Sequence, residues 1–138
     1  MSLQKNLDRA ATLKFPTQAV IDGKLVGARS GKSFDNIGPR DGKVVSKVAE
    51  CGVEDIDAAV KAARASFEDG RWRNKTPREK KKIMFRLAEL MERDLEDIAF
   101  HETPDMGKPI RDTRSIDVPT AINSIRWYAE ALDKVYGE

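Results

Sequence analysis

The residues most capable of nucleophilic or metal chemistry are few in this sequence. Cys51 is its only thiol and His101 its only imidazole. A thiolate activated by an adjacent imidazole makes a strong nucleophile, but no feature of the sequence brings these two residues together. One cysteine and one histidine also cannot supply a zinc-binding cluster or an intrachain disulfide. An ordinary buried or half-buried side chain is therefore the favoured interpretation of Cys51.

Two segments match nucleotide-binding sequences only in part. Residues 71–82, RWRNKTPREKKK, place seven basic side chains around Trp72, as in some single-stranded nucleic-acid binders. The same residues fit the charged outer face of an amphipathic helix, which is the favoured interpretation. Gly107-Lys108 matches the end of a phosphate-binding loop, but the upstream glycine is missing and Pro109 replaces the serine or threonine that reaches magnesium. We therefore predict no nucleic-acid partner.

The composition narrows the class of protein further. At 138 residues the chain has the size of one domain, and its formal net charge of +2 favours neither nucleic acid nor an anionic membrane as a partner. No segment approaches the roughly 20 apolar residues that span a bilayer. A single cysteine is typical of a reducing compartment, so we expect a soluble, cytoplasmic protein.

The elements that would position these residues fall into two halves. Between residues 18 and 49, Asp22-Gly23 and Asp41-Gly42 have the composition of tight turns between short apolar segments, which predicts β-hairpins. From Gly52 onward the apolar residues recur with a helical period. The residues alone therefore predict a soluble piece with strands followed by helices, without a catalytic constellation.

The first two predicted helices have clear boundaries. The first follows Gly52 and stops at Gly70. The second begins with Thr76 as N-cap, Pro77 at the first position and Glu79 completing a capping box. The stripe of the first helix consists of Val53, Ile56, Val60, Ala63 and Phe67. The buried stripe expected for the second consists of Ile83, Leu87, Leu90 and Met91.

Two further helices are predicted toward the C-terminus. Asp94 is expected to cap a third helix, which should end or bend at Thr103 because Pro104 disfavours helical geometry at the residue before it. Its inward residues are Leu95, Ile98 and Ala99. A fourth helix is predicted over residues 117–136, with Gly137 as its terminator. Its stripe consists of Val118, Ile122, Ile125, Ala129, Leu132 and Tyr136.

A series of short motifs carries a resemblance to a known family. They are Ile21-Asp22-Gly23, EDID at 54–57 before AVKAA at 59–63, Arg71-Trp72-Arg73, Glu102-Thr103 with Asp105 and Gly107-Lys108-Pro109, and Arg126-Trp127-Tyr128-Ala129. In this order, from Val20 to Glu138, they resemble the N-terminal stretch of the NAD(P)-dependent aldehyde dehydrogenase superfamily. The resemblance implies an α/β fold, of which this chain holds a β-hairpin segment and about four helices that flank a Rossmann-like sheet absent from it.

The resemblance also implies a role for each segment of the chain. Residues 1–17 would form an N-terminal arm, 18–49 a hairpin segment of the oligomerisation region, and 50–138 the helical, truncated start of the NAD(P)-binding domain. The family's nucleophilic cysteine, general-base glutamate and cofactor motifs follow the point that corresponds to Glu138, and Cys51 matches none of them. We therefore expect this chain alone to be inactive, and its partners to be the remainder of its own polypeptide and other subunits.

The family's activity is the oxidation of an aldehyde to a carboxylic acid with NAD or NADP. Within it, IRWYAEALDKVYGE at the end of the chain is closest to the branch acting on γ-glutamyl-aminobutyraldehyde and other amino-aldehydes. The resemblance does not identify the aldehyde or choose between NAD and NADP, because the residues that choose lie downstream.

Two sets of site residues follow from the resemblance. In many members, a monovalent cation, K⁺ or Na⁺, is held at positions matching Asn36, Ile37 and Asp105, although Gly38 and Pro104 here depart from the usual residues. The substrate channel of the amino-aldehyde branch carries acidic groups at positions matching Asp117 and Thr120.

The sequence leaves two alternatives open. Asp117 also fits an N-cap, with Pro119 just inside the helix. The whole chain also fits a free-standing, non-catalytic helical binding module. If it is instead part of a longer enzyme, its helices should bury only part of their apolar stripes, and self-association through the exposed surface is plausible.

Overall fold

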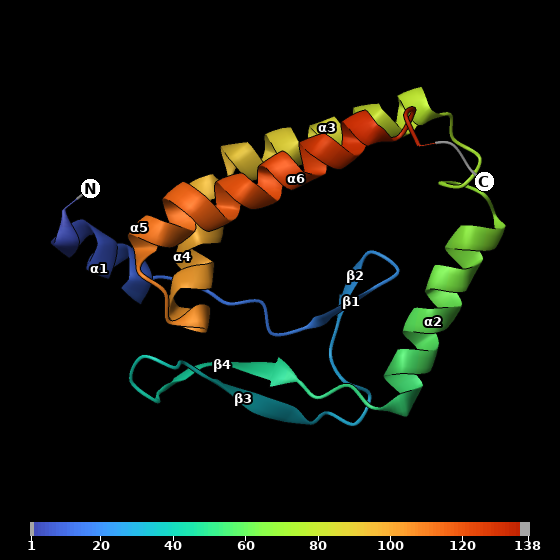
Figure 1. The fold of residues 1–138 in the computed structure, drawn as a ribbon. Helices are drawn as coiled ribbons and strands as arrows, with labels where there is room; N and C mark the ends of the chain where they lie inside the picture. The colour runs from blue at the N-terminus through green and yellow to red at the C-terminus, as the bar shows by residue number, and fades with distance from the viewer. Residues whose placement is uncertain (1, 136–138) are drawn as a thin grey trace.

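The computed structural model describes residues 2–135, which form short strands followed by long helices (Figure 1). In chain order the elements are α1 (Leu3–Ala11), β1 (Ala19–Ile21), β2 (Lys24–Val26), β3 (Ser33–Ile37), β4 (Val44–Ala49), α2 (Val53–Glu68), α3 (Pro77–Arg93), α4 (Leu95–Met106), α5 (Ile110–Asp112), the π-helical turn η1 (Thr113–Asp117) and α6 (Val118–Ala131). This α/β composition agrees with the fold expected from the sequence.

Both predicted hairpins are present, each as a separate antiparallel pair. Strands β1 and β2 are joined by Asp22 and Gly23, whose φ angles of 52° and 72° are both left-handed, as the tightest hairpin turns require. Strands β3 and β4 pair from Ser33 opposite Ala49 to a register shift between Asn36 and Ile37. The shift leaves Val45 of β4 without an opposite residue, which is the pattern of a β-bulge.

The predicted boundaries of α2 and α3 are confirmed. Helix α2 ends at Glu68, and Gly70 follows with a φ of 74°. At the start of α3 the Thr76 hydroxyl accepts a hydrogen bond from the Glu79 amide at 3.3 Å, and the Glu79 carboxylate accepts one from the Thr76 amide at 2.8 Å. The bond from the Thr76 amide, and a second one that the Thr76 hydroxyl donates to the Glu79 carboxylate at 2.8 Å, hold the pKa of Glu79 below its usual value, because they stabilise the ionised carboxylate.

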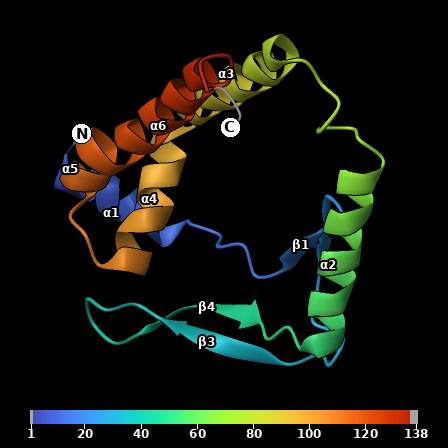
Figure 2. The same cartoon turned by 45° about the vertical axis from the view of Figure 1, so that its right-hand side comes forward.

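The buried core lies where α3, α4 and α6 meet. Helices α3 and α6 run side by side, and α4 crosses their ends (Figures 1 and 2). The core consists of Ala88, Ala99, Val118 and Ile122, each at most 3% exposed. Alanine at two of these positions permits close approach of the helix backbones, and Met91, Leu95, Ile98, Ile110 and Ile125 pack around the centre. The inward residues predicted for α4 are confirmed here, as is the stripe predicted for α6 from Val118 to Leu132; its last member, Tyr136, lies outside the described residues.

Two helix boundaries differ from the predictions, and one predicted cap bond is missing. Helix α4 does not end at Thr103 but continues through Pro104 to Met106. The proline lies in the last turn, so its missing amide removes a bond from a helix that ends two residues later. Asp94 precedes α4 as predicted, but its side chain makes no cap bond and pairs with Arg93 instead, which lowers its pKa.

The fourth helix also begins earlier than expected. Its helical backbone starts at Ile110 and passes through η1 into α6, so Asp117 has helical angles and makes no cap bond. The N-cap interpretation of Asp117 is therefore wrong. The predicted end at Tyr136 and Gly137 lies outside the described residues.

Helix α1 was not predicted within the N-terminal arm. The Ser2 hydroxyl accepts a hydrogen bond from the Lys5 amide at 3.4 Å and caps this helix. Leu3, Leu7 and Ala10 line one side of it and face α4 across a cavity. The serine cap and the spacing of these apolar residues are the local signals from which the helix could have been predicted.

A large apolar surface remains exposed. The accessible area is 10197 Å², whereas a closed domain of 15.5 kDa exposes about 7,200 Å². Helix α2 lies apart from α3 and α6 in both views, and its stripe residue Val60 is 60% exposed (Figure 2). In α3, Ile83 and Leu87 are exposed, so the prediction of a fully buried stripe is wrong: Ala88 faces the core in their place. The expectation of only partly buried stripes is confirmed.

Candidate functional site

The first candidate site lies where α4 ends and η1 begins. Gly107 ends α4 with a φ of 70°, and a Cβ atom there would lie 2.8 Å from Cγ of Pro39, so a side chain is excluded on two counts. The chain then reverses, and Lys108 donates a hydrogen bond from Nζ to Oδ2 of Asp117 at 2.7 Å. The turn thus brings an ammonium and a carboxylate together across nine residues.

The π-helical turn fixes the position of Asp117. Thr113 is fully buried at its start and donates a hydrogen bond to the Ile110 carbonyl at 3.2 Å. Its hydroxyl also lies 2.9 Å from the Thr103 hydroxyl, which ties η1 to α4. A π-turn contains one more residue than an α-turn, so the side chains after it are rotated around the axis. Such turns are frequent at functional sites, and Asp117 is the last residue of this one.

The electrostatics of this site are those of a partly shielded ion pair. The side chain of Asp117 is 24% exposed and that of Lys108 is 43% exposed. Donation to Asp117 raises the pKa of Lys108, and the nearby carboxylates of Glu102 and Asp112 add to the effect. Thr120 is exposed one turn further along α6, on the same side as Asp117. A single carboxylate in this place can receive a cation.

The second candidate site joins β3 to α4. The Asn36 amide donates from Nδ2 to Oδ1 of Asp105 at 2.6 Å, across 69 residues of sequence. Ile37 follows at the strand bulge, and its side chain is exposed. Gly38 comes next, where an added Cβ would lie 2.8 Å from the Val45 side chain. Two of the three residues expected at a cation site are therefore in direct contact.

The chemistry of this second set suits a hard cation. The strand bulge interrupts the regular pairing of backbone groups at Asn36 and Ile37, next to an exposed carboxylate. Carboxylate and carbonyl oxygens are the ligands that alkali and alkaline-earth cations prefer. Within residues 2–135, no group of three or more His, Cys, Asp or Glu side chains is arranged to hold a metal. Backbone oxygens would therefore have to supply most of the ligands.

Comparison with known proteins decides the family. The model of the aldehyde dehydrogenase family matches residues 26–138. The chain belongs to the aldehyde dehydrogenase family. The aminoacetaldehyde dehydrogenase of Pseudomonas aeruginosa is 47% identical over 127 residues, which cover 92% of this chain and 26% of the relative. The NADP/NAD-dependent aldehyde dehydrogenase PuuC of Escherichia coli is 41% identical and covers 95% and 26%.

Solved structures of the family agree along the whole chain. The γ-glutamyl-γ-aminobutyraldehyde dehydrogenase of Burkholderia cenocepacia has a TM-score of 0.95 and 44% identity, covering 100% of this chain and 28% of that one. The indole-3-acetaldehyde dehydrogenase AldA of P. syringae, solved with NAD⁺, has a TM-score of 0.94 and 40% identity, covering 100% and 28%. The chain thus spans about a quarter of the length of these aldehyde dehydrogenases.

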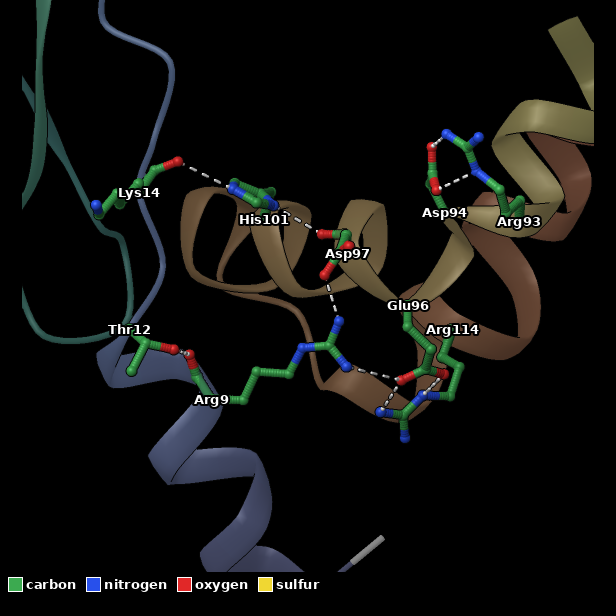
Figure 3. A network of polar contacts seen from close by, with 9 residues as sticks. All are labelled: Arg9, Thr12, Lys14, Arg93, Asp94, Glu96, Asp97, His101 and Arg114. Atoms are coloured by element: carbon green, nitrogen blue, oxygen red, sulfur yellow. Dashed lines mark hydrogen bonds and ion pairs between the residues drawn. The ribbon is translucent and has the colours of Figure 1, made fainter.

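The two residues most suited to nucleophilic chemistry are not paired in this aldehyde dehydrogenase segment. Nδ1 of His101 lies 2.7 Å from the Asp97 carbonyl oxygen, and Nε2 lies 3.2 Å from the Lys14 carbonyl oxygen (Figure 3). Both ring nitrogens are therefore occupied by backbone groups. Cys51 is half-buried just before α2, in line with the ordinary role expected for it.

A network of charges around His101 holds the N-terminal arm in place. Arg9 of α1 reaches Asp97 and lies 3.9 Å from Glu96 (Figure 3). Arg114 of η1 donates to the same Glu96 at 2.9 Å. The Phe100 ring lies under both guanidiniums, 4.6 Å from that of Arg9 and 5.7 Å from that of Arg114. Sequence reasoning missed this network, because it joins residues up to 88 positions apart.

Several basic side chains of the stretch at 71–82 have partners within the chain. Arg71 pairs with Asp69, and Lys80 donates to the Arg73 carbonyl at 3.2 Å. Lys81 pairs with Asp133, two residues beyond the end of α6, at 2.9 Å. These contacts support the interpretation as a helix face with structural ion pairs.

Proposed function

We propose that this chain is the N-terminal part of an NAD(P)-dependent aldehyde dehydrogenase that oxidises an aldehyde, and an amino-aldehyde in particular, to a carboxylic acid. The observation that carries the proposal is the agreement over the full chain with a γ-glutamyl-γ-aminobutyraldehyde dehydrogenase, at a TM-score of 0.95 and 44% identity. The 47% identity with an aminoacetaldehyde dehydrogenase supports the substrate class.

This segment would contribute to the cofactor-binding domain and to the assembly of subunits. NAD or NADP would supply the hydride acceptor, held by residues beyond this segment. The exposed stripes of α2 and α3, part of an accessible area about 3,000 Å² above that of a closed domain, would be covered by the rest of the polypeptide and by other subunits. Residues 18–49 would belong to the subunit-assembly region, residues 50–138 to the start of the cofactor domain, and the enzyme would be cytoplasmic.

Asp117 and Thr120 would line the substrate channel. Asp117 is half-buried and already accepts an ammonium, that of Lys108, at 2.7 Å. A carboxylate in this setting suits the ammonium of an amino-aldehyde, since partial burial strengthens the attraction between opposite charges. Thr120, exposed one turn away, would add a hydroxyl for hydrogen bonding.

Asp105 and the backbone oxygens of Asn36 and Ile37 would hold K⁺ or Na⁺. The donor set fits, and the ion would tie β3 to α4 at the strand bulge. In the complete enzyme, Asp105→Ala should weaken the dependence of activity and melting temperature on potassium or sodium. Identical salt dependence in the two proteins would exclude the cation site.

The function is tested by measuring aldehyde-dependent formation of NAD(P)H. We expect activity from the complete polypeptide and none from the 138-residue chain, which lacks the family's nucleophile. Asp117→Ala should raise KM for aminoacetaldehyde more than KM for propanal, its neutral counterpart of the same size. Activity of the short chain, or equal effects on both aldehydes, would contradict the respective part of the proposal.

A further inference from the structure

The ion pair between Lys108 and Asp117 has a consequence for substrate choice. Nζ of Lys108 donates to Oδ2 of Asp117 at 2.7 Å, which is the distance expected for a charge-assisted hydrogen bond. The carboxylate proposed to receive the substrate's ammonium is thus occupied by an ammonium from the protein itself. A primary alkylammonium is also the group that an amino-aldehyde presents. The side chain of Lys108 therefore mimics the cationic end of the substrate.

Resting on the function proposed above, we propose that Lys108 is a specificity-determining residue: its ammonium competes with that of a cationic aldehyde for Asp117, and so sets the preference between cationic and neutral substrates. A neutral aldehyde gains nothing from displacing it. A cationic aldehyde binds Asp117 only when Lys108 leaves.

The surroundings allow this exchange. Lys108 follows the turn at Gly107 and its side chain is 43% exposed, so it is not locked by packing. The carboxylates of Glu102 and Asp112 lie near enough to favour its charged form. Lys108 also lines a cavity of about 380 Å³ between α1 and α4, which gives the aliphatic stem room to move.

Asp117 is less free to move than its partner. Its backbone belongs to the π-turn that the buried hydroxyl of Thr113 anchors to α4, and its side chain is only 24% exposed. The carboxylate therefore stays in place when the lysine leaves. This asymmetry, a fixed acceptor with a mobile donor, is what a site for exchange between two ammonium groups requires.

The test compares Lys108→Met with the unsubstituted protein in the complete enzyme, using aminoacetaldehyde and propanal, which differ only by an ammonium in place of a methyl group. Because exposed ion pairs are weak, we expect the ratio of kcat/KM for aminoacetaldehyde to kcat/KM for propanal to rise about two- to fivefold, through a lower KM for aminoacetaldehyde. Lys108→Arg should restore the original ratio.

Two controls separate competition from a general charge effect. Arg111→Met removes one positive charge nearby, from a residue that is paired with Asp112 and not with Asp117, and should leave the ratio of the two aldehydes unchanged. In an Asp117→Asn background, Lys108→Met should no longer alter the ratio, since the shared acceptor has lost its charge.

Other outcomes would overturn the inference. An unchanged ratio with a lower melting temperature would identify the pair as a structural latch only. A change of equal size in the ratio with Arg111→Met would show that the total positive charge near the site, and not competition for Asp117, sets the substrate preference. If the unsubstituted complete enzyme oxidised neither aldehyde, the proposed function would fail and this inference with it. If the enzyme were active but its ratio of kcat/KM for the two aldehydes did not change in Lys108→Met, only this inference would be overturned.

Discussion

Helices α2 and α6 have equally regular apolar stripes, yet only one of them is buried. Val118 of α6 is 2% exposed, whereas Val60 of α2 is 60% exposed. The helical region of α3, α4 and α6 closes around its own core, while the region of the hairpins and α2 holds together through turns and polar anchors. The difference teaches that an amphipathic pattern identifies the face of a helix that will be covered, but not the segment that covers it.

The largest effect expected from this comparison is on core packing. Ile122→Ala should lower the free energy of unfolding by about 2 to 5 kcal/mol, because it leaves a cavity beside Ala88 and Ala99. In the 138-residue chain, the corresponding change in α2, Ile56→Ala, should cost less than about 0.5 kcal/mol, since that side chain is exposed there. Urea denaturation followed by circular dichroism measures both values, and equal losses would break the comparison.

The next effect concerns the polar anchor of α2. Asp55 is 4% exposed and accepts hydrogen bonds from the amides of Gly52 at 2.9 Å and Arg29 at 3.1 Å. Asp55→Ala leaves both donors without this partner, so we expect a loss of about 1 to 3 kcal/mol in the free energy of unfolding. Asp57→Ala, an exposed carboxylate in the same turn, should change it by only a few tenths. If the two variants were equally stable, α2 would not depend on this anchor.

A smaller effect is expected at the junction of the two regions. Thr76→Ala removes the cap of α3 and should cost about 1 kcal/mol. Thr76→Ser keeps the hydroxyl and should retain most of the stability. Thermal unfolding of the two variants tests this, and a serine variant as unstable as the alanine variant would assign the effect to the lost methyl group instead of the cap.

The smallest effect is electrostatic and depends on pH. Hydrogen bonds from Lys81 and then Lys134 lower the pKa of Asp133 from 3.8 to about 2. Because the folded-state pKa is depressed, any stabilisation from these contacts is fully present above about pH 4 and is lost as the pH falls toward 2. Carboxyl NMR titration should give a midpoint near the lower value, and Lys81→Met should move it toward 3.8. If the midpoint of Asp133 were the same with and without the Lys81 side chain, α3 would not interact with the residues that follow α6 through this pair.

Local chemistry made much of this fold predictable. The left-handed pair Asp22-Gly23, the capping box at Thr76 and the stop at Gly70 each depend on residues within a few positions of one another, and each appears as predicted. Helix α4 continues past Thr103, where the sequence predicted an end or a bend, because a proline costs little in the last turn of a helix.

The candidate sites were also only partly predictable from the sequence. Family resemblance picked out Asp105 and Asp117, but not the partners that meet them. The bond from Asn36 to Asp105 spans 69 residues and the tether from Arg9 to Asp97 spans 88, so only the folded chain decides them. The pair of Lys108 and Asp117 is closer in sequence, yet it depends on a π-turn that no residue pattern announced.

The sequence by itself determined the turns, the helix caps, the apolar faces and the family of this protein, because these depend on short-range sterics, hydrogen bonding and the order of motifs. Only the tertiary structure decided which apolar face is buried and which cation neutralises which carboxylate. Those outcomes depend on distances between segments far apart in the chain, which are fixed only when the backbones of α3, α4 and α6 pack together.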